Sequence, residues 1–103
     1  MKKILLVCDL GMSTSLVVKR MQEAAVKRGL EVEIQAKGMS DFKNVITAFD
    51  CALLGPQIAY KLADCKQIAA PLNKRVETIN MMDYGMVNGE KILDHALSLI
   101  NKN

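Results

Sequence analysis

Short apolar segments alternate along this chain with stretches whose apolar residues repeat at helical spacing, and no other feature of the sequence constrains the fold as strongly. The segments that predict strands are residues 3–8, 30–36, 50–55 and 75–80, and those that predict helices are residues 13–28, 40–49, 57–69 and 88–102. This alternation with short links is typical of an open parallel sheet with helices on both faces and right-handed crossovers. We therefore predict an α/β fold with four parallel strands in the order 2-1-3-4, the short flavodoxin-like arrangement that low-molecular-weight phosphatases resemble.

The individual segments support these assignments. Residues 4–8 are apolar throughout, as expected of a strand covered on both faces, whereas residues 30–36 alternate between apolar and polar, as expected of a half-exposed edge strand. Gly29 stands where the end of the first helix favours a residue that tolerates positive φ, and Ser40 or Asp41 is expected to cap the second helix. In such sheets ligands bind at the carboxyl ends of the strands where the strand order reverses, here beside the first strand.

Composition limits the classes of protein to consider. The chain has 103 residues, of which 50% are hydrophobic and 24% charged, and this predicts one folded domain over residues 1–103. The longest apolar runs, residues 4–8 and 51–54, are far shorter than the roughly 20 residues of a membrane-spanning helix, and the N-terminus has no signal-peptide pattern. We therefore expect a cytoplasmic monomer without membrane insertion.

The net charge is +3, but basic and acidic side chains are interleaved and aromatic residues are few, which argues against nucleic-acid binding.

The chain has three cysteines, Cys8, Cys51 and Cys65, and no C-x-x-C pair. An odd number does not suit a disulfide framework, and His95, on the polar side of the last helix, offers no set of zinc ligands. We therefore expect no disulfide, no metal site and no cofactor. Cys51 falls in a buried strand and Cys65 on a helix, so both are expected to be structural.

The segment from Cys8 to Ser15 combines the features of a phosphate site. A cysteine ends the first strand, Gly11 permits a tight turn, and three hydroxyl residues lead into a helix. The successive backbone N–H groups of residues 10–15 could surround an anion, because a helix N-terminus exposes unpaired donors and carries partial positive charge. The same field favours a thiolate, the reactive form of cysteine. From the residues alone, two interpretations stay open: a phosphate cradle with a nucleophile, or a small apolar residue before a helix cap.

The residues missing around Cys8 narrow its chemistry. A cysteine phosphatase of the C-x5-R type clamps the phosphoryl group with an arginine, and Thr14 occupies that position here. No histidine lies nearby in sequence to activate water. Such a loop could hold a phosphocysteine without hydrolysing it, while the attacking and leaving atoms come from two other proteins. The sequence thus favours a phosphoryl relay, with a low-molecular-weight phosphatase or arsenate reductase as the alternative.

Two further classes share this sheet. A flavin-binding protein would hold the flavin phosphate with Ser13, Thr14 and Ser15, but few aromatic side chains are available to stack on the ring. A response-regulator receiver is excluded, because Gly55 ends the third strand where that class needs a phospho-accepting aspartate.

Three motifs resemble a known family. They are C-D-L-G-M-S-T-S at residues 8–15, L-L-G-P-Q-I-A-Y at residues 53–60 and Y-G-x-V-x-G at residues 84–89. In this order they are similar to the IIB component of the lactose/cellobiose (chitobiose) type of the bacterial sugar phosphotransferase system, over essentially the whole chain. The resemblance implies a four-stranded parallel α/β fold and a phosphotransferase that carries a phosphoryl group. It also implies that Cys8 takes this group from a phosphohistidine on a IIA protein and passes it to a sugar of the cellobiose, chitobiose or lactose class that enters through the IIC permease.

The resemblance further implies that the loop after Cys8 binds the phosphate. Its residues are Asp9, Leu10, Gly11, Met12, Ser13, Thr14 and Ser15. A carboxylate beside the thiolate would raise the pKa of the cysteine, so we expect the side chain of Asp9 to point out of the loop.

Other residues are expected at the same end of the sheet. Gln57 and Tyr60 follow the third strand and are candidates for shaping the site or a partner surface. Tyr84 is expected in the loop after the fourth strand, where it packs rather than reacts. Met81 and Met82 could offer the adaptable apolar surface that a protein with two partners needs.

Overall fold

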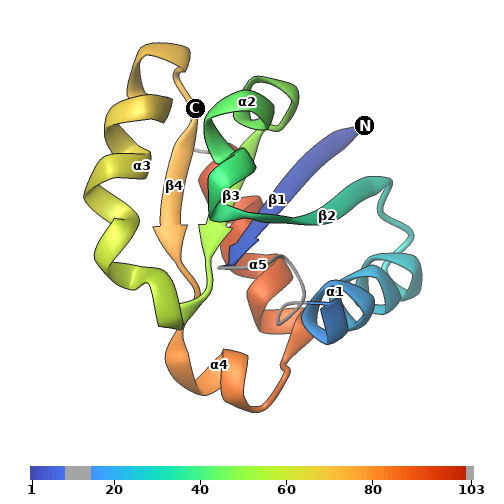
Figure 1. Ribbon diagram of the computed structural model, residues 1–103. Coiled ribbons are helices and arrows are strands. Elements are labelled where there is room, and N and C mark those ends of the chain that lie inside the picture. Colours follow the sequence, from blue (N-terminus) through green and yellow to red (C-terminus); the bar gives the residue numbers. More distant parts are fainter. Residues whose placement is uncertain (9–14, 102–103) are drawn as a thin grey trace.

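Four parallel strands form one sheet between two layers of helices (Figure 1). The computed structural model describes residues 1–8 and 15–101. The strands are β1 (Lys2–Cys8), β2 (Val32–Gly38), β3 (Cys51–Leu54) and β4 (Arg75–Thr78). Their order is β2-β1-β3-β4 and every neighbouring pair is parallel, with Cys8 opposite Gly38 and Val7 opposite Leu54. The predicted fold class and strand order are therefore confirmed, and β2 lies at an edge as expected.

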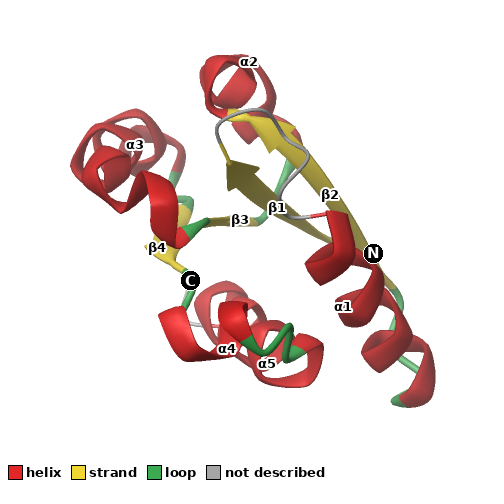
Figure 2. Ribbon diagram, turned by 60° about the horizontal axis from the view of Figure 1, so that its bottom comes forward, coloured by secondary structure: helices red, strands yellow, loops and turns green. Residues whose placement is uncertain are grey.

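The helices divide between the two faces of the sheet (Figure 2). The longer helices, α1 (Ser15–Lys27) and α5 (Gly89–Asn101), pack together on one face, whereas α2 (Phe42–Val45) and α3 (Leu62–Ala69) cover the other. Parallel strands can be joined only by crossover segments. Here the crossovers carry α2 and α3 over one face of the sheet, while α1 and α5 lie on the other.

The core follows from the period-two alternation of the central strand β1. Ile4 and Leu6 point into the cluster shared with α1 and α5, and Leu5 and Val7 into the cluster that contains Phe42 of α2. None of these five side chains is exposed to solvent. Each such residue contributes about 1.5–3 kcal/mol to folding by leaving water, so a strand with this composition is held in place from both sides.

Two backbone hydrogen bonds and a glycine end the helix α1 at its carboxyl terminus. Gly29 has a φ of 68°, as predicted for the residue after the helix. The N–H of Leu30 donates to the carbonyl of Ala25 and the N–H of Gly29 to that of Val26, the two hydrogen bonds of a Schellman C-cap.

The second and third predicted helices differ from the structure in form. Around α2 and α3 the chain adopts short 3₁₀ turns, at Met39–Asp41, Ile46–Ala48, Pro56–Lys61 and Ala70–Leu72. The prediction that Ser40 or Asp41 caps the second helix is wrong. The 3₁₀ turn at Met39–Asp41 already starts after Gly38, Asp41 itself has a helical conformation, and neither this turn nor α2 has a side-chain cap. The apolar spacing located these segments but did not separate 3₁₀ from α geometry.

A further helix was absent from the sequence prediction. Residues predicted as loop after the fourth strand form α4 (Met81–Gly85), which contains Tyr84. The side chain of Asn80 accepts hydrogen bonds from the N–H groups of Met82 and Asp83, at 2.9 and 3.1 Å, and so caps the helix. Five residues are too few for an apolar period to be recognised, and the asparagine cap was the available signal.

Candidate functional site

The segments that follow β3 and β4 leave from the carboxyl edge of the sheet (Figure 1). The N–H of Gly55 donates to the carbonyl of Val7 at 2.8 Å, and the N–H of Ile79 donates to the carbonyl of Leu54 at 2.8 Å. These bonds continue the ladder by one residue past the ends of β3 and β4. The segment after β3 therefore starts next to the end of β1, and the segment after β4 starts next to the end of β3, at the edge of the sheet where a ligand is expected.

Cys8 is the last residue of β1, and only 2% of its surface is exposed. By the alternation along the strand it lies on the same face as Ile4 and Leu6, the face that α1 and α5 cover. Its backbone pairs with Gly38 of β2, and the preceding residue, Val7, pairs with Leu54 of β3. The thiol is thus sheltered at the carboxyl edge of the sheet, at the end of a strand that is paired on both sides.

Part of the predicted phosphate loop can be located. Residues 9–14 lie outside the described residues, so the outward orientation of Asp9 stays a prediction. Ser15 is the first residue of α1 and is exposed. The first turn of α1 has no acidic side chain, so nothing on that turn neutralises the partial positive charge of the helix N-terminus. Cys8 and Ser15 are the two predicted site residues that the structure describes.

Gly55 lies next to Cys8, as the sequence predicted, and the end of the Gln57 side chain lies next to Gly55. A Cβ built on Gly55 would lie 3.9 Å from the Cβ of Cys8 and 3.0 Å from Oε1 of Gln57. The side chain of Gln57 therefore bends back over Gly55, toward the end of β1. Tyr60, by contrast, is 73% exposed, and its ring lies 5.7 Å from the ammonium of Lys61. Of Gln57 and Tyr60, only Gln57 contacts Gly55, the neighbour of Cys8.

The helix α4 lies at the same end of the molecule (Figure 1). Met81, Met82 and Met86 are largely exposed, whereas Tyr84 is half-buried against the core, as expected. Exposed methionines give an adaptable surface. Met86 was not singled out from the sequence, because its exposure depends on the unpredicted helix.

The other two cysteines lie inside the protein, as expected. The thiol of Cys51 donates to the carbonyl of Ala96 at 3.5 Å, and burial, with a smaller contribution from the carboxylate of Asp50, raises its pKa to about 12. The thiol of Cys65 lies 3.7 Å from the sulfur of Met39, and burial raises its pKa to about 11. Thiols with such pKa values hold almost no thiolate at neutral pH and are poor nucleophiles.

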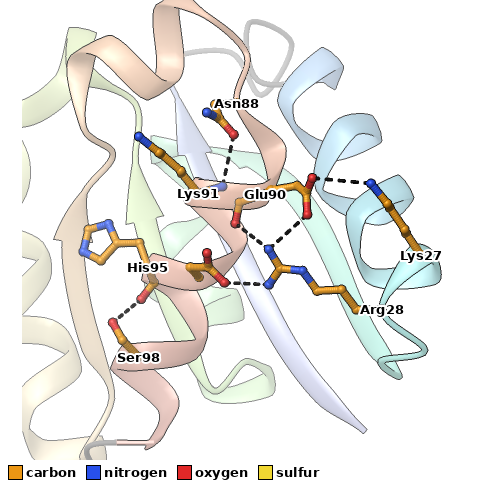
Figure 3. A network of polar contacts seen from close by, with 8 residues as sticks. Lys27, Arg28, Asn88, Glu90, Lys91, His95 and Ser98 are labelled. Carbon is orange, nitrogen blue, oxygen red and sulfur yellow. Dashed lines mark hydrogen bonds and ion pairs between the residues drawn. The ribbon is translucent and has the colours of Figure 1, made fainter.

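His95 is half-buried on α5, where its backbone carbonyl accepts a hydrogen bond from the hydroxyl of Ser98 at 2.6 Å (Figure 3). Figure 3 shows its ring on the side of α5 opposite Arg28. Within residues 1–8 and 15–101, no three His, Cys, Asp or Glu side chains gather closely enough to hold a metal ion. Over the same residues, no helix has the length and apolar character needed to cross a bilayer.

The chain has clear relatives. The sequence model of the family described as "PTS system, Lactose/Cellobiose specific IIB subunit" matches residues 3–95. The oligo-beta-mannoside-specific EIIB component of Bacillus subtilis (strain 168) is 45% identical over 100 residues, and the galactose-specific EIIB component of Lactococcus lactis subsp. cremoris (strain MG1363) is 40% identical over 105 residues; each match covers 97% of both chains. The solution structure of a cellobiose-specific IIB component from Borrelia burgdorferi superposes with a TM-score of 0.83 at 37% identity, over 98% of this chain and 93% of that one.

The fold and these relatives define a class of protein, the EIIB phosphotransferase components of bacterial sugar uptake. This chain belongs to the lactose/cellobiose-specific IIB family of the phosphotransferase system. Proteins of this family transfer phosphoryl groups in sugar uptake and act together with IIA and IIC components. The resemblance noted in the sequence is thereby confirmed.

Proposed function

We propose that Cys8 is the phosphoryl carrier of this protein, that its donor is the phosphohistidine of a IIA protein, and that its acceptor is a sugar bound to a IIC permease. One observation carries the assignment to Cys8: of the three thiols, it alone ends a strand at the carboxyl edge of the sheet, beside the point where the strand order reverses. Cys51 and Cys65 are buried in the two cores.

The chemistry consists of two balanced transfers. In the first, the thiolate of Cys8 attacks the phosphorus of the donor, so that an S–P bond forms, the N–P bond breaks and the departing imidazole takes up a proton. In the second, a sugar hydroxyl attacks the same phosphorus, the S–P bond breaks, and the thiolate is restored as the hydroxyl proton passes to a base on the permease. Each step needs the entering and leaving atoms in line, and those atoms come from the partners.

The loop of residues 9–15 is proposed to hold the phosphoryl group. Backbone N–H groups before and within the first turn of α1 would bind its oxygens, as helix N-termini bind anions elsewhere. The absence of acidic side chains from that turn supports this role. Thr14 stands where a cysteine phosphatase has its arginine, so the phosphocysteine is expected to persist until an acceptor arrives.

The relatives do not select one sugar. Their names give oligo-beta-mannosides, galactose and cellobiose for proteins of comparable similarity to this chain. We propose a sugar of the cellobiose, chitobiose or lactose class, and a single IIB domain that works in the cytoplasm as a monomer.

The relay can be tested with radiolabelled phosphate. The protein is charged from phosphorylated IIA, freed of donor, and then mixed with membranes that contain the matching permease and candidate sugars. The proposal predicts that label leaves the protein as sugar phosphate, and only with sugar present. Release as inorganic phosphate at the same rate without sugar, or turnover of p-nitrophenyl phosphate by the pure protein, would indicate a phosphatase instead.

A further inference from the structure

The helices α1 and α5 approach each other closely at Gly89, the first residue of α5. Gly89 is buried, and a Cβ built on it would lie 2.6 Å from the carbonyl oxygen of Arg20 and 2.7 Å from the Cβ of Arg20. Most of the nearest atoms belong to the backbone of α1, so no change of rotamer could make room for a side chain. The observed packing of the two helices therefore requires glycine at this position.

The chain just before Gly89 is held in an unusual conformation. Val87 has a φ of 52°, in the left-handed region that β-branched residues rarely adopt. Its side chain packs against the core, and its carbonyl accepts a hydrogen bond from the N–H of Gly89 at 3.0 Å. The N–H of Asn88 donates to the carbonyl of Asp83 at 2.8 Å. Such a conformation persists only when its surroundings determine it, so the start of α5 is closely fixed relative to α4 and the core.

A second contact joins the other end of α1 to α5 (Figure 3). The guanidinium of Arg28 forms ion pairs with Asp94 and with Glu90, the latter at 3.2 Å, and Lys27 lies 3.9 Å from Glu90. Hydrogen bonds from Arg28 to Asp94, and then to Glu90, raise the pKa of the guanidinium. Exposed ion pairs contribute little to stability, but together with Gly89 they hold α1 against α5 at two places along its length.

The position of α1 bears on the proposed site, because Ser15 begins this helix and the predicted phosphate loop leads into it. Arg20 lies five residues further along, about 7.5 Å away on a rigid helix. We propose that Gly89 is a positioning residue for phosphoryl transfer: by allowing α1 to approach α5, it sets where the amino end of α1 lies relative to Cys8. This inference rests on the proposed role of Cys8.

The size of the effect follows from the contact distances. A methyl group at Gly89 would need ordinary van der Waals spacing of roughly 3.4–4 Å from the Arg20 backbone, so α1 would move by about 1 Å. A misplacement of about 1 Å in a reacting assembly can reduce the rate by roughly 100-fold, even when the mutation lies far from the chemistry. We expect Gly89→Ala to lower kcat for transfer from phosphorylated IIA by roughly 10- to 100-fold and to leave KM for the donor within about twofold.

Two control variants separate an effect on the position of α1 from an effect on the stability of the protein. Gly85→Ala makes the same change at the end of α4, where a built Cβ meets no atom of the described residues within 4 Å, and should keep kcat within about twofold. Val76→Ala opens a cavity on the opposite face of the sheet, and should keep kcat although the protein is less stable. All variants are assayed at a temperature at which each is fully folded.

The backbone amide chemical shifts of Leu16, Val17 and Val18 in the unphosphorylated protein give an independent readout. They should change in Gly89→Ala and not in Val76→Ala. A Gly89→Ala protein with wild-type kcat and wild-type shifts would overturn the proposal, as would an equal loss of kcat in Val76→Ala. If the wild type itself takes no phosphoryl group on Cys8, the proposed function fails, while the shifts still decide whether Gly89 positions α1.

If Gly89→Ala does not fold, the second contact supplies the test. Arg28→Ala should lower kcat by at least twofold, and Arg28→Lys should restore part of it by keeping a cation near Asp94. Unchanged kcat and unchanged amide shifts of the first turn in Arg28→Ala would then overturn the proposal.

Discussion

The two interior cysteines should be almost inert toward alkylating agents in the folded protein. Burial raises the pKa of Cys51 from 9.0 to about 12 and that of Cys65 from 9.0 to about 11. At pH 8 a thiol with the ordinary value is roughly one-tenth ionised, whereas Cys65 would be ionised to about one part in 1,000 and Cys51 to about one part in 10,000. Folding should therefore slow alkylation by about 100-fold at Cys65 and about 1,000-fold at Cys51.

The assay is a time course with iodoacetamide at pH 8, followed by digestion and mass analysis of the three cysteine peptides, in buffer and in concentrated guanidinium chloride. Cys8 is also sheltered, but it ends its strand before the N-terminus of α1, whose partial positive charge favours a thiolate. In buffer we therefore expect label at Cys8 first, and a Cys8→Ser protein should take up almost none. All three sites should react in the denaturant. Labelling of Cys51 in the folded protein within about tenfold of its unfolded rate would refute the reasoning from burial.

The same pKa shift predicts a pH dependence of stability. Because the pKa of Cys51 is higher in the folded than in the unfolded chain, its contribution is fully present below about pH 9 and is lost as the pH rises toward 12. The elevation corresponds to at most about 4 kcal/mol. Urea unfolding at pH 8 and pH 10.5 should show a smaller loss of stability with pH in Cys51→Ala than in the wild type. Equal losses in both proteins would contradict the assignment.

Three further substitutions test the packing around the site. Gly55→Ala should change the free energy of unfolding by less than about 1 kcal/mol, because its φ of −60° suits alanine and only the end of the Gln57 side chain must move. The added methyl group should nevertheless slow the phosphorylation of Cys8, which a transfer assay measures. A loss of stability above about 2 kcal/mol in urea unfolding would contradict the geometry. Asn80→Ala should lower the free energy of unfolding by about 1 kcal/mol by removing the cap of α4, and an unchanged urea midpoint would mean that the cap contributes nothing. Leu53→Ala should cost about 2–5 kcal/mol, seen as a lower Tm, since its side chain is fully buried, and a smaller loss would indicate that the core can close around the gap.

The sheet could be predicted from the sequence because its strands are short and apolar and its links are brief. The continuous run of β1 and the alternation of β2 distinguish a central strand from an edge strand, and Gly29 identifies the end of α1. These signals are local, so they can be read without knowledge of the tertiary contacts.

The features that sequence reasoning missed depend on tertiary contacts or on very short segments. The helix α4 is five residues long, and the 3₁₀ turns beside α2 and α3 are shorter than an apolar period can resolve. The left-handed conformation of Val87 is opposed by its own side chain and is imposed by its surroundings. Gly89 was visible in the motif of residues 84–89, but its function as a contact with Arg20 appears only when α1 and α5 are placed together.

For the candidate site, the sequence predicted correctly that Gly55 lies beside Cys8, since it follows a strand adjacent to β1. It could not show that the thiol is sheltered, because burial depends on how helices from distant parts of the chain cover the sheet.

Cys8 is the proposed carrier of the phosphoryl group. The most direct measurement is the intact mass of the protein after incubation with phosphorylated IIA, for the wild type, Cys8→Ser and the matched interior variant Cys51→Ser. If Cys8 carries the phosphoryl group, the wild type and Cys51→Ser each gain one phosphate, and Cys8→Ser gains none. A phosphate that still appears in Cys8→Ser, or one that disappears in Cys51→Ser while that protein is folded, would contradict this role of Cys8.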